Sequence, residues 1–267
     1  MDRELFVLFA LTFLIHLIGT LAYSVRIAGT RTGRIAVSYA LFNLLMLVSR
    51  TSNSFQGPLL AKRIELNLGR GIAGGVVGDF RWLIAAATLA TVAGALLIPT
   101  FQRVFGRAVI AFGEHRSVPR LLWLGLSRPG FAYLRGSLRL PARGNLTRLA
   151  GGERLPGGVI LSNVVATAIW TVGVFASLYA GYLNPHLRTT SSNLSSIING
   201  LATILMFGLI DPSLSVLTDD VVEGRISDGY FRRSIVWLVG GRLAGTMLAQ
   251  ALLVPAAFVI VYVAERL

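Results

Sequence analysis

Six runs of about 20 mostly apolar residues are the feature that most constrains how this chain of 267 residues can fold. A helix rises about 1.5 Å per residue, so a run of this length matches the hydrocarbon thickness of a bilayer. A mean hydropathy of +0.68 lies outside the range of water-soluble globular proteins. The sequence therefore predicts one all-α domain, a polytopic membrane bundle of about six transmembrane helices. The predicted spans are residues 5–25, 35–55, 82–104, 158–182, 194–217 and 234–263.

Basic residues are distributed unevenly between the two predicted sides of the membrane. The connections 26–34, 103–154 and 225–233 fall on one side and hold most of the 25 basic residues. The positive-inside rule places that side in the cytoplasm and both termini outside. The basic connection over 105–155 interleaves Arg with Trp123 and other aromatic residues, which predicts interfacial helices in the cytoplasmic headgroup layer. An ordinary basic loop is the alternative.

Composition restricts the partners and excludes several kinds of site. All the basic residues except Lys62 are Arg, which indicates either biased composition or phosphate recognition by the planar guanidinium fork. A net charge of +13 in a chain that is 54% apolar favours anionic membrane lipids over nucleic acid. Without cysteine, the chain has no disulfide, thiolate metal site or cysteine nucleophile. We therefore expect no cofactor. The oligomeric state, including a homo-oligomer, is left open.

The second predicted span carries charged and amide side chains that a lipid-facing helix would not tolerate. A guanidinium at a bilayer centre costs about 2.5–3.5 kcal/mol on insertion scales. Arg50 either extends to the outer interface or lines a polar cavity, and the polar groups around it favour the cavity. Three further arginines cluster at or near the predicted cytoplasmic turn between the first and second spans. The predicted substrate-binding residues are Arg26, Arg31, Arg34, Asn43, Arg50, Asn53 and Gln56.

Three ionisable residues in the other spans are candidates for ion pairing or coupling. Asp211 and Arg242 lie at similar predicted depths, which favours an ion pair between them, either structural or part of a transport mechanism. His16 lies near the middle of the first span. It is either a proton relay or a hydrogen-bonded interior histidine.

One acidic cluster has the spacing of a magnesium site. Asp219, Asp220 and Glu223 place two adjacent carboxylates one helical turn from a third. Enzymes that transfer prenyl groups require a second such cluster, and the remaining acids here are scattered. A solvated helix cap is the alternative role of these residues.

Three stretches of the first two spans resemble the Amj family, the "alternate to MurJ" lipid II flippases of bacterial peptidoglycan synthesis. They are Tyr23–Thr32, Leu47–Asn53 and Phe55–Leu60. The resemblance implies a multi-pass protein of the bacterial cytoplasmic membrane that takes part in cell wall biogenesis. Its substrate would be lipid II, which is undecaprenyl diphosphate carrying a disaccharide-pentapeptide. The implied reaction is translocation from the inner to the outer leaflet.

Two other functions remain open at this point. A magnesium-dependent membrane enzyme acting on polyprenyl phosphates would use the acidic cluster. A small-solute transporter or an assembly scaffold is the third hypothesis. No clear inverted repeat is visible in the sequence, which gives the common transporter architectures little support.

Overall fold

The computed structural model describes residues 2–69, 75–141 and 155–267, and these parts are helical with no strand. Six helical segments are long and apolar enough to cross a membrane. Each contains one of the six predicted runs, so the predicted all-α, polytopic architecture is confirmed. The single-helix segments are α1 (Arg3–Thr32), α2 (Ile35–Gly69), α3 (Val76–His115), α7 (Gly157–Leu183) and α10 (Asp228–Ala264).

The fifth segment is a rod of several joined elements. It begins with a short 3₁₀ turn, η1 (Pro185–Leu187), and continues as α8 (Arg188–Leu205). One π-helical turn, η2 (Met206–Ile210), then leads into α9 (Asp211–Val222). A π turn inside a helix shifts the faces of the residues that follow it. The rod therefore presents different faces before and after residues 206–210.

Local signals beyond the apolar runs set the ends of the helices. Asp2 caps α1 by accepting a hydrogen bond from the Leu5 N–H at 2.8 Å. Gly33 ends the same helix at φ 66°, a conformation that favours glycine. Helix α3 continues to His115, so the connection predicted over 105–155 begins as helix. Residues 142–154 of that connection lie outside the described residues.

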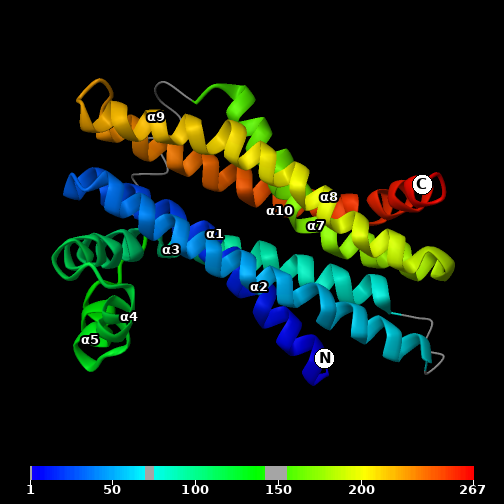
Figure 1. The fold of residues 1–267 in the computed structure, drawn as a ribbon. Helices are drawn as coiled ribbons and strands as arrows, with labels where there is room; N and C mark the ends of the chain where they lie inside the picture. Colours follow the sequence, from blue (N-terminus) through cyan, green and yellow to red (C-terminus); the bar gives the residue numbers. More distant parts are fainter. Residues whose placement is uncertain (1, 70–74, 142–154) are drawn as a thin grey trace.

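Two short helices occupy the described part of the basic connection. These are α4 (Val118–Leu126) and α5 (Arg128–Gly136), each capped by a serine and carrying a proline in its first turn. Trp123, Leu126 and Phe131 are exposed on them. Figure 1 shows α4 and α5 at one end of the bundle. Their location in the headgroup layer stays a prediction.

The long helices form two units with the same packing order. In the first unit, α1 packs against both α2 and α3. In the second unit, α7 packs against both α8 and α10, and the units meet mainly where α3 contacts α10. A unit of three spans ends on the side opposite to its start, so the second unit runs inverted relative to the first. The two units repeat the order in which their helices pack, and such a repeat need not be visible in the sequence. The lack of a visible sequence repeat is therefore no argument against a transporter.

The two ends of the bundle differ in what they carry (Figure 1). The basic end holds the α1–α2 turn, α4, α5 and the α9–α10 turn. The terminal end holds both termini, the end of α2 and the start of α8. Arg63 on α2 ties the terminal end together through Asp2 at 2.8 Å and Asp79 at 2.9 Å.

We expect Gly245→Ala to destabilise the contact between α10 and α7. A Cβ at Gly245 would lie 2.6 Å from the Val164 carbonyl oxygen, so the helices would have to separate. Overpacking of this kind costs about 1–3 kcal/mol. Gly240→Ala on the same helix is the matched control, because its Cβ would meet nothing within 4 Å. The measurement is the apparent melting temperature in detergent, which should fall only for Gly245→Ala.

Candidate functional site

A cavity in the basic half of the bundle, called here the arginine cavity, is lined by both units. Its volume is about 30 Å³. An enclosed water needs roughly 10–15 Å³ by the same kind of measure, so the cavity accommodates only small groups as it stands. Its lining residues are Gly19, Tyr23, Phe42, Met46, Asn163, Met206, Phe207, Ile210, Asp211 and Arg242.

Arg26 is buried beside this cavity and holds α1 to α9. Its side chain donates a hydrogen bond to Ser215 Oγ at 3.2 Å, and Nη2 lies 4.0 Å from Asp211 Oδ1. The guanidinium lies over the rings of Tyr39 at 4.4 Å and Phe42 at 4.6 Å. The rings and the carboxylate together replace the water that a surface arginine would have.

The expected ion pair between Asp211 and Arg242 is wrong, because Asp211 pairs with Arg26. Similar depth along the membrane normal was the basis for expecting that pair. Asp211 in α9 lies beside Arg26, whereas the Arg242 guanidinium lies against Gly19, two helical turns earlier on the same face of α1. The positions of the side chains in the packed helices, which the predicted depth does not give, therefore decide the pairing.

Arg242 is buried at the cavity wall without a carboxylate. Its exposed fraction is 6%, and no acidic side chain in the described parts of the chain forms an ion pair with it. Its Nε atom has no hydrogen-bond partner among the described residues. Gly19 makes room for the guanidinium, since a Cβ there would collide with it.

Arg50 extends from α2 to Phe207, one of the residues that line the cavity. Its guanidinium lies 4.5 Å from the ring centroid of Phe207 in η2. Its Nε is buried without a hydrogen-bond partner among the described residues. The side chain therefore contacts the cavity wall in the middle of its helix, as the cavity interpretation of the sequence expected. Its role in binding stays a prediction.

The charges around the cavity do not balance. Arg26, Arg50 and Arg242 approach it from α1, α2 and α10, and Asp211 is the carboxylate among its lining residues. Three guanidiniums against one carboxylate leave two positive charges in excess. In a bundle of membrane-spanning helices such an excess favours binding of an anion.

The other predicted residues do not form one cluster with these. Gln56 donates to Thr12 Oγ1, and its neighbour Ser49 donates to the Ile15 carbonyl at 3.2 Å, so both face α1. Asn43 is exposed and Asn53 is half-buried on α2.

The expected arginine cluster at the cytoplasmic mouth is also divided. Arg34 donates to the Ile110 carbonyl at 3.0 Å and so ties the α1–α2 turn to α3. Arg31 is exposed at the basic end. Of the three arginines, Arg26 contacts Phe42 and Asp211, which line the cavity. His16 is buried in α1, and its Nδ1 has no hydrogen-bond partner among the described residues, so its proton-relay role stays a prediction.

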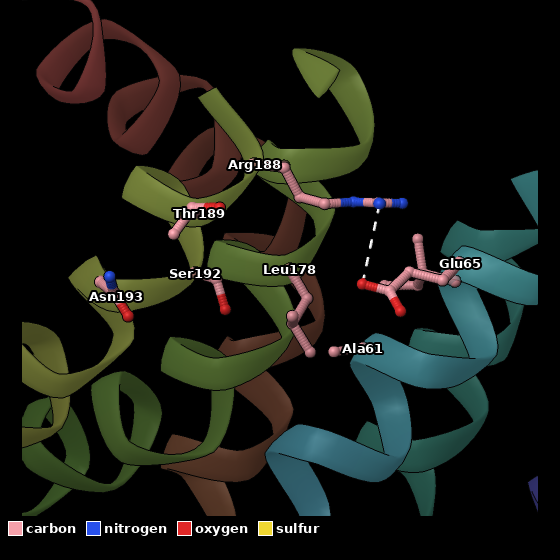
Figure 2. Close-up of a pocket in the computed structure, with 9 residues that line it drawn as sticks. Ala61, Glu65, Leu178, Arg188, Thr189, Ser192 and Asn193 are labelled. Carbon is pink, nitrogen blue, oxygen red and sulfur yellow. Dashed lines mark ion pairs between the residues drawn. The ribbon is translucent and has the colours of Figure 1, made fainter. Parts of the chain in front are cut away.

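A second cavity, called here the terminal pocket, lies near the opposite end of the same two units. Its volume is about 160 Å³. Figure 2 shows Arg188 extending from α8 toward Glu65 on α2, and the two groups approach to 3.7 Å. The lining residues are Ala61, Ile64, Glu65, Leu178, Gly181, Arg188, Thr189, Ser192 and Asn193.

The sequence interpretation missed this pocket because the fifth span was taken to begin at residue 194. The signal was present in the run 189–196, in which every residue except Leu194 carries a hydroxyl or an amide. A polar run of this kind at the start of a membrane-spanning segment indicates a helix that faces something other than lipid.

The acidic cluster does not form a metal site in the described parts of the chain. Arg225 pairs with Asp220 at 2.7 Å and also with Glu223. Asp219 is exposed, and no group of three potential metal ligands is found among the described residues. The magnesium-dependent enzyme hypothesis therefore loses the site on which it depended.

Comparison with known proteins decides the family. A family model described as "Amj: Alternate to MurJ" matches residues 11–264. The chain belongs to the Amj family. One curated member, the lipid II flippase Amj of Bacillus subtilis (strain 168), is 38% identical over 263 residues, which cover 97% of this chain and 96% of the relative. No solved structure matches the chain. The resemblance noted over the first two spans is thus confirmed, and the Amj match extends through the central basic region.

We expect Asp211→Asn to lower the stability of this Amj protein, because it removes the carboxylate that pairs with the buried Arg26. Breaking a buried ion pair by removing one partner costs about 3–5 kcal/mol. Adding Arg26→Gln should restore part of the loss, and adding Arg242→Gln should restore less. The measurement is a double-mutant cycle on the apparent melting temperature in detergent. Equal coupling to Arg26 and Arg242 would contradict the pairing described above.

Proposed function

We propose that this Amj family protein is a lipid II flippase of the bacterial cytoplasmic membrane, a transporter and not an enzyme. The 38% identity to a protein named a lipid II flippase supports the assignment, as do the six membrane-spanning helices. The observation that carries the chemistry is the excess of guanidinium groups at the arginine cavity. The substrate would move from the inner to the outer leaflet, with the basic end of the bundle in the cytoplasm.

A diphosphate matches the arginine cavity in charge and in geometry. Its oxygens carry at least two negative charges, which balance the excess left by Arg26, Arg50 and Arg242 against Asp211. Each guanidinium can donate two parallel hydrogen bonds to a phosphate. The walls would have to separate for the headgroup to enter, because the cavity holds about 30 Å³. The polyprenyl chain would remain in the lipid beside the bundle.

The faces of α2 and α8 provide a route from the arginine cavity to the terminal pocket. On α2, residues three or four positions apart share one face of the helix, and this face runs from Met46 through Arg50, Asn53 and Gly57 to Ala61. A Cβ added at Gly57 would meet nothing within 4 Å. The headgroup would therefore pass side chains that are polar or small. Several moderate contacts along this route favour release better than one deep site.

The side chains along the matching face of α8 are also polar or small. It leads from Asn193 through Ser196, Gly200 and Thr203 to Phe207 at the arginine cavity. Gly200, like the glycine on α2, faces open space within 4 Å. Both walls of the route thus lack large apolar side chains between the two cavities, which suits a hydrated headgroup.

The basic end gives the protein a surface for anionic membrane lipids. Exposed Trp123, Leu126 and Phe131 lie on the two short helices there, among several arginines. Aromatic and basic side chains together favour the headgroup layer of a membrane. We include anionic lipids among the proposed partners on this basis.

We expect Arg50→Ala to abolish lipid II flipping while the protein level stays normal. Arg50→Lys should also be impaired, because an ammonium lacks the planar fork that holds two phosphate oxygens. The measurement is complementation in cells depleted of their resident lipid II flippase, with labelled lipid II detected on the outer surface. Arg3→Ala, an exposed arginine outside both cavities, is the matched control. Normal flipping by Arg50→Ala would remove Arg50 from the mechanism.

We expect Asp220→Asn and chelation of divalent cations to leave flipping unchanged. Asp220 is held by Arg225 and does not line the arginine cavity. The measurement is the initial flipping rate of the purified protein in liposomes with and without EDTA. A loss of activity that added magnesium restores would revive the enzyme hypothesis.

A further inference from the structure

Two ion pairs join the two units of the bundle, and they lie toward opposite ends. Arg26 of the first unit approaches Asp211 of the second at 4.0 Å, in the basic half. Arg188 of the second unit approaches Glu65 of the first at 3.7 Å, in the terminal half. The other ion pairs between described side chains lie within one unit.

The two pairs occupy equivalent places in the inverted arrangement. Arg26 lies near the end of α1, and its partner comes from the far half of the α8–α9 rod. Arg188 lies where α7 gives way to α8, and its partner comes from the far half of α2. In each case an arginine near the hairpin turn of one unit meets a carboxylate on the second span of the other unit.

We propose that the terminal pocket is a second binding site for the diphosphate headgroup, at which phosphate oxygens replace the Glu65 carboxylate on Arg188. This inference rests on the proposed function. The substrate would reach this site after leaving the arginine cavity and before entering the outer leaflet. No bond in the substrate forms or breaks.

The Arg188–Glu65 pair is exposed and weak, so Arg188 can exchange the Glu65 carboxylate for another anion. The Glu65 side chain is 58% exposed and the Arg188 side chain 34% exposed, whereas that of Arg26 is 2% exposed. At 3.7 Å the pair has no hydrogen bond within the usual range. An exposed pair of this kind is weak, so a ligand with more negative charge than one carboxylate competes well for the guanidinium.

The rest of the terminal pocket suits a phosphate and the sugar attached to it. Thr189, Ser192 and Asn193 line it with hydroxyl and amide groups on one side of α8, as Figure 2 shows. Gly181 leaves room for the Arg188 backbone, whose Cα would lie 3.2 Å from a Cβ at that position. The volume of about 160 Å³ exceeds that of the arginine cavity, so the headgroup needs less rearrangement here.

The test is the affinity of the full-length protein in nanodiscs for undecaprenyl diphosphate, with undecaprenol as the ligand that lacks phosphate. Arg188→Gln should weaken diphosphate binding by about tenfold to a hundredfold, the range for losing a charge-assisted hydrogen bond. Glu65→Gln should strengthen it several-fold by removing the competitor. The double variant should bind like Arg188→Gln. Each measurement is repeated with Arg50→Ala, so that the arginine cavity contributes less.

Two control variants match these changes in chemistry and location. Glu4→Gln removes an exposed carboxylate that also lies 3.7 Å from an arginine at the terminal end, outside the pocket. Arg266→Gln removes an exposed arginine at the same end. Neither should change the affinity. Undecaprenol binding should be the same for all variants.

The outcomes separate this inference from the proposed function. Unchanged affinity in both Arg188→Gln and Glu65→Gln, or an equal decrease in both, would overturn the second site. The flippase proposal would then stand or fall on whether the unmodified protein moves lipid II across liposome membranes. If it does not, while the two variants shift diphosphate affinity in opposite directions, the flippase proposal fails and the terminal pocket remains an anion site.

Discussion

The burial of guanidinium groups among apolar helices is the constraint on which the rest of this structure depends. Arg26 is accommodated by two aromatic rings, a serine hydroxyl and Asp211, whereas Arg242 is accommodated by the space that Gly19 leaves. One carboxylate cannot neutralise three cations, so the arginine cavity keeps a positive charge in a place where water is scarce. That excess links the fold to the transport of an anionic lipid.

The inverted arrangement of the two three-helix units places one arginine–carboxylate pair between the units in each half of the bundle. Each unit contributes one arginine near its hairpin turn and one carboxylate on its second span, so the units are linked across both halves of the bundle. The pair in the basic half is buried, and the pair in the terminal half is exposed. On the proposals above, a headgroup that competes for these arginines would change the contacts between the two units. Binding and rearrangement of the bundle would then be coupled through the same side chains.

The second span shows how much of a binding site the helical periodicity of the sequence can predict. Its polar residues were expected to line a cavity, and Arg50 does contact the cavity wall. Gln56, by contrast, bonds to α1. Periodicity assigns residues to faces of a helix, but it does not tell which face meets another helix and which meets a cavity. The same limit produced the wrong partner for Asp211, which pairs with Arg26 and not with Arg242.

The sequence by itself determined the number and approximate position of the spans, the presence of arginines within them and the Amj family. It did so because transfer of apolar residues into lipid depends on local composition, and because the family resemblance lies in contiguous residues. Only the tertiary structure decided the inverted packing of the two units, the Arg26–Asp211 pair and the terminal pocket. These depend on contacts between residues far apart in the chain, such as Glu65 and Arg188, and local composition carries no information about which helices become neighbours.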